Sequence, residues 1–327
     1  MDSITQAVLG IAVAHVGFNQ RTNKLKTVVF GALVASLPDL DIYISKLIND
    51  PLAEVELHRG FSHSLLFFIF LTLIISLLFR KCFPKLSFNR LYITTFFILL
   101  THSLLDVFTT WGTQLFWWYP EKYALKSIFV VDLFYTIPLS FGVYLGLKMQ
   151  KIRFTTWGMI ISSLYLVWGL VAQNWIKNET RQEFISQHQV EFIELTVKPT
   201  FSNSILWNVI IQTDQGFYLS DRSIFDKEPM VFQFFPHQHH LINNLKSDQN
   251  IQRLVAISEN QFIITENQNG LVFNDLRFGL LKNDKADIQF AFSYQLIPTT
   301  TGFKVEELPK DRRDGKQLLI QLWNRIF

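Results

Sequence analysis

Long hydrophobic runs alternate with short polar segments through the first 176 residues of the chain. A helix that crosses a bilayer needs about 20 mostly apolar residues, because the hydrocarbon core is about 30 Å thick and an α-helix rises about 1.5 Å per residue. Six runs approach that length, at residues 4–18, 28–44, 61–79, 91–108, 128–147 and 155–176. The first two runs are short enough to tilt or to end within the bilayer. The pattern predicts an all-α multi-pass transmembrane helical bundle over residues 1–177.

The hydrophobic pattern changes to a period of two residues from about residue 190. Residues 205–211 and 216–224 are apolar-rich runs on either side of TDQG at 213–216, which is a typical hairpin signal. Further strands are expected at 254–257, 261–265, 270–274, 288–296 and 302–306, and short helices at 241–247 and 316–326. We therefore expect a mainly β (α+β) extramembrane domain over residues 178–327, without a visible catalytic constellation of its own.

Basic residues are distributed unevenly among the short loops between the predicted spans. Loops 19–27, 80–90 and 148–154 together carry ten Lys and Arg residues, whereas the intervening loops carry four. Since Lys and Arg are retained on the cytoplasmic side, the three basic loops are expected inside. The amino terminus and the C-terminal half are then expected on the outer, periplasmic side of a bacterial inner membrane.

The composition agrees with a membrane protein and excludes several other classes. Hydrophobic residues make up 49% of the chain and charged residues only 17%, where soluble proteins have about a quarter. A net charge of +3 is too small to indicate a nucleic-acid partner. The single cysteine, Cys82, allows neither an internal disulfide nor a metal site built from thiolates.

Ionisable residues gather at the ends of the predicted spans, where each is a candidate for function because charge is costly in a membrane. They are Asp39, Asp41, His58, His63, His102, Asp106 and Asp132. With the topology above, all seven lie at the outer ends of their helices. This convergence indicates a site near the outer surface of the bilayer.

Imidazole nitrogen and carboxylate oxygen are suitable ligands for Zn²⁺, and for Mn²⁺ or Fe²⁺ as alternatives. Without thiolates, such a site is expected to be open and catalytic rather than closed and structural. His102 and Asp106 are four residues apart, so they lie on one helix face and either share a metal or orient one another.

Each of these residues, taken alone, also has a structural interpretation. Asp39 or Asp41 would cap a helix or end a span. His102 and Asp106 would form a hydrogen-bonded pair between helices. Asp132 would form an ion pair with a nearby Lys or Arg. The joint occurrence of three His and several Asp at one depth favours the functional interpretation.

Several segments resemble the YdjM-type family of bacterial membrane-bound metal-dependent hydrolases. They are PDLD at 38–41, HRGFSHSLLF at 58–67, HSLLDVFTTWGTQLFWW at 102–118 and FVVDLFYTIPL at 129–139. KPTFSNSILWNVIIQTDQGFYL at 198–219 and NDLRFG at 274–279 are similar to extended members of that family. The order of the segments also resembles, more distantly, zinc-dependent phospholipase C and P1-type nucleases, which suggests phosphodiester chemistry.

The resemblance implies a ligand set and a set of supporting residues. Metal ligands are implied at Asp39, Asp41, His58, His63, His102 and Asp106, and supporting positions at Asp132, Thr110, Gly112 and Gln114. We also expect supporting roles for Gln6 and Arg59. Members often carry Thr-His where this chain has Thr5-Gln6, and glutamine coordinates metals more weakly than histidine. A carboxylate not bound to metal, Asp41 or Asp132, is expected to have the catalytic role of taking the proton from water.

The sequence therefore predicts a membrane-bound metal-dependent hydrolase that uses zinc, or manganese or iron, to activate water. Its partners would be the lipid bilayer and a lipid-headgroup ester or phosphodiester substrate at the outer surface, with the substrate and the oligomeric state left open. The alternatives are a metal- or proton-handling membrane protein without hydrolysis, and a non-catalytic envelope scaffold that binds partners through its β domain. An ion relay would need titratable residues through the middle of the membrane, and the central parts of the strong spans carry none.

Overall fold

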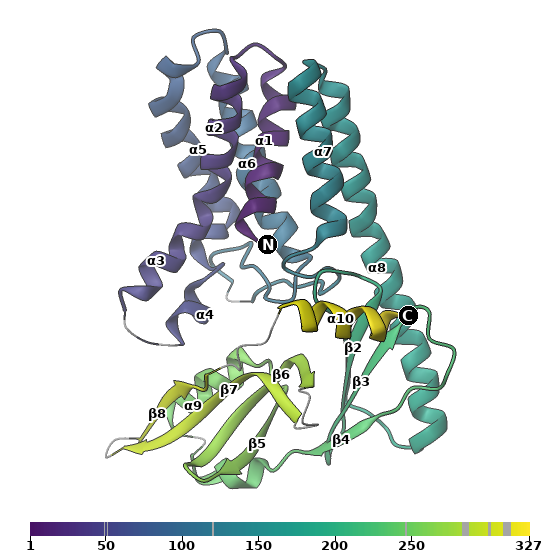
Figure 1. The fold of residues 1–327 in the computed structure, drawn as a ribbon. Coiled ribbons are helices and arrows are strands. Elements are labelled where there is room, and N and C mark those ends of the chain that lie inside the picture. Colours follow the sequence, from purple (N-terminus) through teal and green to yellow (C-terminus); the bar gives the residue numbers. More distant parts are fainter. Residues whose placement is uncertain are drawn as a thin grey trace. The chain divides into compact units, whose positions relative to one another are not determined.

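The structure, a computed structural model, describes the chain except residues 49, 51, 120, 246, 283–287, 300–301 and 310–314. Its first part is helical (Figure 1). The helices are α1 (Ser3–Phe18), α2 (Lys24–Ser36), α3 (Asp41–Lys46), α4 (Ala53–Leu57), α5 (Leu65–Phe79), α6 (Phe88–Val107), α7 (Leu133–Met149) and α8 (Ile152–His188). Short 3₁₀ turns lie at Pro38–Leu40, before α3, and at Phe61–His63, before α5.

All six hydrophobic runs contain helix, but fewer than six of these helices are long enough to cross a bilayer alone. Among the described residues, three have the required length and hydropathy: Leu65–Cys82, Phe88–Val107 and Ile152–His188. A fourth span is formed if α2 and Pro38–Ile44, which meet at a bend of 47°, count as one. Of the four longer runs, 128–147 is therefore not confirmed as a full span, because α7, like α1, rises only about 24–26 Å.

Close contacts between glycines bring the helices of this part together. A Cβ on Gly31 of α2 would lie 2.6 Å from the carbonyl oxygen of Gly10 of α1, and a Cβ on Gly142 of α7 would lie 2.6 Å from the Cα of Gly158 of α8. Small residues at such crossings let helix backbones approach closely, as is common in membranes. The buried hydrophobic side chains of this part form one core to which α1, α2, α5, α6 and α7 contribute.

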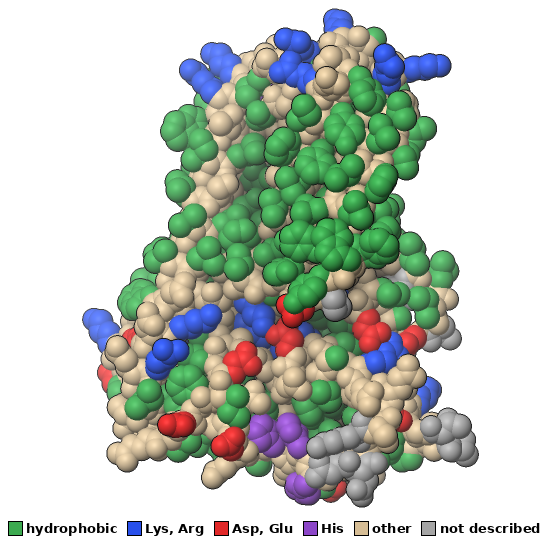
Figure 2. All heavy atoms as spheres, turned by 180° about the vertical axis from the view of Figure 1, so that it is seen from behind, with side chains coloured by type: hydrophobic (Ala, Val, Ile, Leu, Met, Phe, Trp, Pro, Cys, Tyr) green, Lys and Arg blue, Asp and Glu red, His purple; other side chains and the backbone are tan. Residues whose placement is uncertain are grey.

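Three basic loops lie together at one end of the helical part. Lys26, in the first turn of α2, donates a hydrogen bond to the carbonyl oxygen of Cys82, which follows α5, at 3.0 Å. Gln20, which follows α1, donates to the carbonyl oxygen of Gln150, which follows α7. Figure 2 shows Lys and Arg side chains gathered at the top of the view, with a broad band of hydrophobic side chains directly below them. The basic end of α6 is thus the end opposite to His102 and Asp106.

The second part contains two four-stranded sheets. Strands β1 (Glu194–Pro199), β2 (Leu206–Gln212), β3 (Gly216–Ser223) and β4 (Gln233–Pro236) form one sheet, and β5 (Phe262–Asn267), β6 (Gly270–Lys282), β7 (Ile288–Thr299) and β8 (Gly302–Glu307) form the other. Pairing is antiparallel from β2 to β4 and from β5 to β8. Helices α9 (Gln249–Ile257) and α10 (Gly315–Ile326) complete this part. A helical part followed by a β-rich part confirms the coarse fold prediction.

The predicted strand at 254–257 is wrong, because these residues form the last turns of α9. Asp248 caps this helix by accepting hydrogen bonds from the backbone of Asn250 and Ile251. Ile251 and Leu254, three positions apart, are then buried on one face. Short apolar runs of this kind do not distinguish strand from helix by periodicity.

The chain divides into two compact units. Unit 1 comprises residues 1–48, 57–172 and 199–204, and unit 2 comprises residues 49–56, 173–198 and 205–327. Helix α8 runs without a break from unit 1 into unit 2. The two sheets of unit 2 share a small core that includes Ile210, Phe217, Leu219, Ile263 and Leu276.

Candidate metal centre

Asp39 and Asp41 lie where the path of α2 is interrupted. Pro38 begins a 3₁₀ turn that ends the helical direction of α2, and Asp39 lies inside this turn. Asp41 is the first residue of α3. The two carboxylates are therefore fixed on neighbouring turns and project in different directions from a short, bent segment.

A second segment of unit 1 brings His58, Arg59 and His63 to the same place. Arg59 has a φ of 60°, in the left-handed region, and Gly60 follows it. The 3₁₀ turn Phe61–His63 then leads to Ser64, whose hydroxyl caps α5 by accepting a hydrogen bond from the backbone of Phe67. His63 is thus held immediately before the amino-terminal end of a long helix.

His102 and Asp106 lie on one face of α6, near its carboxyl-terminal end. The hydroxyl of Ser103 donates a hydrogen bond to the carbonyl oxygen of His63 at 2.9 Å, which ties α6 to the turn before α5. Both His102 and Asp106 are completely buried.

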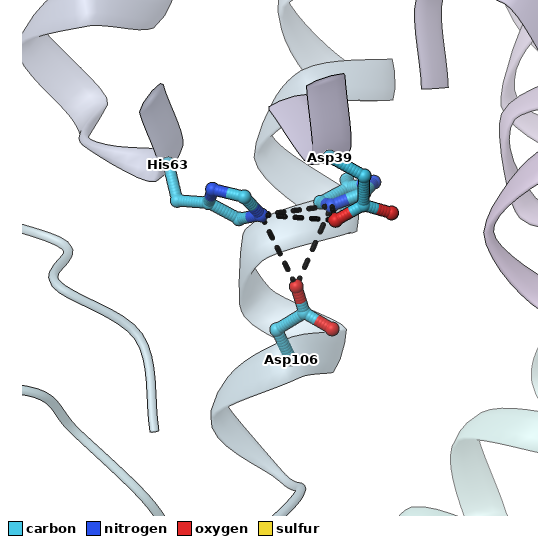
Figure 3. Close-up of side chains that lie close together, drawn as sticks. Asp39, His63 and Asp106 are labelled. Atoms are coloured by element: carbon cyan, nitrogen blue, oxygen red, sulfur yellow. Dashed lines mark hydrogen bonds and ion pairs between the residues drawn. The ribbon is translucent and has the colours of Figure 1, made fainter. Parts of the chain in front are cut away.

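Four side chains converge in unit 1 from these three segments: Asp39, His63, His102 and Asp106. Figure 3 shows Asp39, His63 and Asp106 pointing toward one another. The Nε2 atoms of the two histidines lie 3.2 Å apart. His63 Nε2 lies 3.4 Å from Asp39 Oδ1 and 3.5 Å from Asp106 Oδ2, and His102 Nε2 lies 3.4 Å from each of the same oxygens.

These distances fit a single metal ion. In a tetrahedral site with metal–ligand distances of about 2.0–2.1 Å, neighbouring ligand atoms lie about 3.3 Å apart. Asp106 Oδ2 is buried and has no hydrogen-bond partner within the described part of the chain. A buried carboxylate oxygen without a donor is costly, and a cation at the centre of the four ligands would satisfy it. The donor set of two imidazoles and two carboxylates suits zinc, manganese or iron.

Hydrogen bonds fix the tautomer of His63. Ser62 Oγ lies 2.6 Å from Asp41 Oδ2, to which it donates its only hydrogen, and 2.9 Å from His63 Nδ1. Nδ1 must therefore carry the hydrogen of the His63 ring and donate it to Ser62. The lone pair of the ring lies on Nε2, the atom that faces the other three ligand atoms. A carboxylate that orients a histidine in this way is common behind metal ligands.

Asp41 and His58, which the resemblance implies as ligands, lie beside this group rather than within it. His58 Nδ1 donates to Asp41 Oδ1 at 2.8 Å, and the backbone N–H of Arg59 donates to Asp41 Oδ2 at 3.1 Å. The rings of His58 and His63 have their centroids 5.8 Å apart. Asp41 thus connects the loop that carries His58 to the histidine of the metal site.

Asp106 Oδ1, the oxygen that faces away from the metal position, is surrounded by cations and donors. Arg59 Nη2 lies 3.3 Å from it, Gln6 Nε2 donates to it at 3.1 Å, and the amino group of Met1 forms an ion pair with it. Gln6 Nε2 also donates to the carbonyl oxygen of His102 at 3.1 Å. Gln6 therefore holds two ligand residues in place.

The segment that follows α6 supports the loop of His58 and Arg59. Thr109, which the sequence did not single out, accepts a hydrogen bond from Arg59 Nη1 at 2.7 Å. The backbone N–H of Gln114 donates to the carbonyl oxygen of Arg59 at 2.9 Å, and Lys122 Nζ donates to that of His58 at 2.8 Å.

The remaining predicted supporting residues lie in the same segment. Thr110 is buried, and Gly112 has a φ of 75° with Lys122 packed against it, a conformation that favours glycine. The adjacent Thr113 pairs with Tyr123 as an isolated bridge. Thr110, Gly112 and Gln114 therefore lie outside the group of four.

Asp132 lies at a different position from the four converging residues. It caps α7, where Oδ1 accepts from the backbone N–H of Phe134 at 3.1 Å, and Oδ2 accepts from the hydroxyl of Tyr165 at 3.0 Å. Tyr165 in turn accepts a hydrogen bond from Ser204 Oγ at 2.9 Å. These hydrogen bonds explain why the carboxylate of Asp132 is buried: it caps the amino-terminal end of α7.

Two known proteins are similar to parts of this chain. Over 228 residues the chain is 25% identical to the uncharacterized protein YfhP of Bacillus subtilis (strain 168), and the alignment covers 67% of each protein. Over 117 residues it is 31% identical to the inner membrane protein YbcI of Escherichia coli (strain K12), which covers 36% of this chain and 66% of YbcI. No solved structure matches the chain.

The family described as YdjM inner membrane protein matches residues 1–176. This match includes all four converging residues and confirms the family that the sequence resembled. Together with the candidate spans, it supports a location in the inner membrane. Since this match covers more than half of the 327 residues, the chain belongs to the YdjM family of inner membrane proteins.

Proposed function

We propose that the chain is a membrane-bound metal-dependent hydrolase that cleaves an ester or a phosphodiester at the outer surface of the membrane. The observation that carries this proposal is the convergence of Asp39, His63, His102 and Asp106, with ligand atoms spaced as around a single metal ion. When bound there, a divalent cation, with zinc favoured, supplies Lewis-acid activation of water and of an ester or phosphoryl oxygen.

His58 is the residue that we propose to move the proton. Its Nδ1 donates to Asp41, so its Nε2 has a lone pair that is able to accept a proton from water. The His58 side chain is 23% exposed, whereas His63 and His102 are buried, so solvent reaches His58. Asp41 would stabilise the protonated ring, as a carboxylate does beside a general base. The capping contacts of Asp132 favour a structural role for that carboxylate instead.

The side of the membrane on which the metal centre lies is inferred from the positions of the basic loops. They lie together at one end of the helical part, and His102 and Asp106 lie toward the other end of α6. Because loops rich in Lys and Arg are retained in the cytoplasm, the metal centre is proposed to face the periplasm. A site at this depth suits a substrate whose polar head lies at the bilayer surface.

A hydrolysis assay tests this function. The full chain, purified in detergent and loaded separately with zinc, manganese or iron, would be given a chromogenic phosphodiester, a chromogenic ester and phospholipid vesicles. Wild type and His15→Ala should hydrolyse at least one class, because His15 is a buried histidine bonded to Thr155 outside the cluster. His63→Ala/His102→Ala should be inactive. Metal binding without hydrolysis of any class would contradict the proposal and favour an ion-binding protein.

Replacing Ser62 with alanine should weaken metal binding without abolishing it. The change removes the hydroxyl that fixes the His63 tautomer, and loss of such a partner typically costs about 10–100-fold in metal affinity. Competition with a chelating indicator would measure the affinity. Ser76→Ala is the matched control, because Ser76 Oγ is buried in α5 without a hydrogen-bond partner among the described residues. Equal affinities of the two variants would contradict the role of Ser62.

A further inference from the structure

Helix α10 at the carboxyl-terminal end of unit 2 presents an uncovered hydrophobic face. Leu319, Ile320, Trp323 and Phe327 are each 50–70% exposed. At about 100° per residue these positions fall within about 100° of arc on the α10 axis. Phe225, from the turn after β3, stacks on Phe327 with ring centroids 5.4 Å apart and is itself 52% exposed. Contiguous apolar patches of this kind usually bind a partner or a membrane.

The other side of α10 is fixed on unit 2 by specific contacts. Arg325 makes a bidentate ion pair with Asp226 at 3.0 and 2.9 Å, and Ser223 Oγ donates to the carbonyl oxygen of Ile326 at 2.8 Å. Burial would raise the pKa of Asp226, but hydrogen bonds from Arg325 and from the backbone of Ser223 outweigh it and leave that pKa below its ordinary value. The ion pair therefore persists at neutral pH, and the exposed face is held outward.

The same contacts place α10 near the end of the apolar stretch of α8. Between Arg153 and Lys177, helix α8 carries no charged residue, so its apolar span ends near Trp175. Glu179, about one turn further along, pairs with Arg222 at the end of β3. Arg222 is adjacent to Ser223, which binds the end of α10. The chain of contacts from Glu179 through Arg222 and Ser223 to Ile326 lies entirely within unit 2.

We propose that the face of α10 formed by Leu319, Ile320, Trp323 and Phe327, together with Phe225, lies in the headgroup region of the bilayer that α8 crosses. A tryptophan beside aliphatic residues on one face of an amphipathic helix is typical of helices that lie in this interface. Because the apolar span of α8 ends close to α10, the bilayer surface is the apolar environment that the exposed face of α10 would reach. Unit 2 is then seated on the membrane by two attachments, the span and α10.

Depth-dependent quenching in proteoliposomes of phosphatidylethanolamine and phosphatidylglycerol tests this surface. The full chain with its exposed Cys82 replaced by serine would carry an environment-sensitive fluorophore on Trp323→Cys or on Gln321→Cys. Gln321 is also exposed but lies about 160° around α10 from Trp323. Lipids brominated in their acyl chains should quench the label at position 323 several-fold more than the label at 321, and aqueous iodide should quench it less.

A second labelled position on the same face checks the result, and either of two outcomes would overturn the proposal. Leu319→Cys lies on the same face with Trp323 intact, and it should behave as Trp323→Cys does. Equal quenching of positions 319, 321 and 323 by iodide would show that the face stays in water and would overturn the proposal. Protection of position 323 from both quenchers, with disulfide crosslinking between two chains, would overturn it in favour of a second copy as the occupant.

Discussion

His102→Ala should lower the affinity for zinc by about 10²–10³-fold while the protein stays folded. Structural zinc sites with four ligands contribute about 10–16 kcal/mol, so one ligand accounts for about 2.5–4 kcal/mol, and each 1.4 kcal/mol is about a factor of ten. In the described part of the chain the His102 ring has polar contacts through Nε2 with the other three members of the cluster, and none through Nδ1. Removing the ring therefore breaks few contacts outside the metal site.

Competition with a chelating zinc indicator in detergent would measure this change. His15→Ala is the control, because His15 is another buried histidine of unit 1 whose partner is Thr155. It should keep the affinity of the wild type. Equal losses in the two variants, or none in His102→Ala, would remove His102 from the metal site.

Asp106→Ala should both weaken metal binding, as His102→Ala does, and destabilise the metal-free protein. Asp106 Oδ1 lies 3.3 Å from the guanidinium of Arg59, and the side chains of Arg59 and Asp106 are only 3% and 0% exposed. Removing one partner of a buried ion pair leaves an uncompensated charge, which typically costs about 3–5 kcal/mol. His102→Ala leaves the Arg59–Asp106 pair intact, so it should destabilise the metal-free protein less.

Unfolding in detergent with a strong chelator present would separate this effect from loss of metal. The informative variant is Asp106→Ala/Arg59→Met, which removes both charges and keeps an apolar side chain of similar length. It should recover part of the stability lost in Asp106→Ala, because Arg59 no longer adds an unpaired charge to that of the Met1 amino group, but its metal affinity should stay as low as that of Asp106→Ala. A double variant that is as unstable as Asp106→Ala, or less stable, would mean that the ion pair is not the cause.

The sequence was sufficient to predict the two halves of the fold, because membrane helices and exposed strands have different hydrophobic periods. It was not sufficient to predict how many helices span the membrane. Helix α2 and the short helix α3 appear as one apolar run, and only the structure shows the bend at Pro38. Residues 254–257 were assigned to the wrong element because four apolar residues in succession fit a strand or the end of a helix equally well.

The sequence also indicated which residues approach the metal position, but not their individual contacts. His102 and Asp106 could be paired from their spacing on one helix. Asp39 and Asp41 could not be distinguished, since both flank the same turn, and only the structure shows that Asp39 Oδ1 faces the histidines whereas Asp41 binds His58 and Ser62. Spacing alone gives no information on hydrogen bonds between segments that are distant along the chain.

The hydrogen bonds of two further residues, Thr109 and Gln6, could not be predicted from the sequence. Thr109 is one of several threonines after α6, and its role depends on the left-handed conformation of Arg59, which turns the guanidinium toward it. Gln6 was singled out because the family resemblance led us to expect a histidine there. Its hydrogen bonds to Asp106 and to the backbone of His102 support two ligand residues, and the identity of residue 6 alone does not predict them.

Elemental analysis of the purified protein tests the central claim most directly. Wild type and His63→Ala/His102→Ala would be equilibrated in detergent with limiting zinc, manganese and iron, and the metal bound per chain would then be measured. The account predicts near-stoichiometric metal in the wild type and background in the double variant, with zinc favoured. Wild-type protein that retains no more metal than the double variant would contradict the assignment of Asp39, His63, His102 and Asp106 as a metal centre.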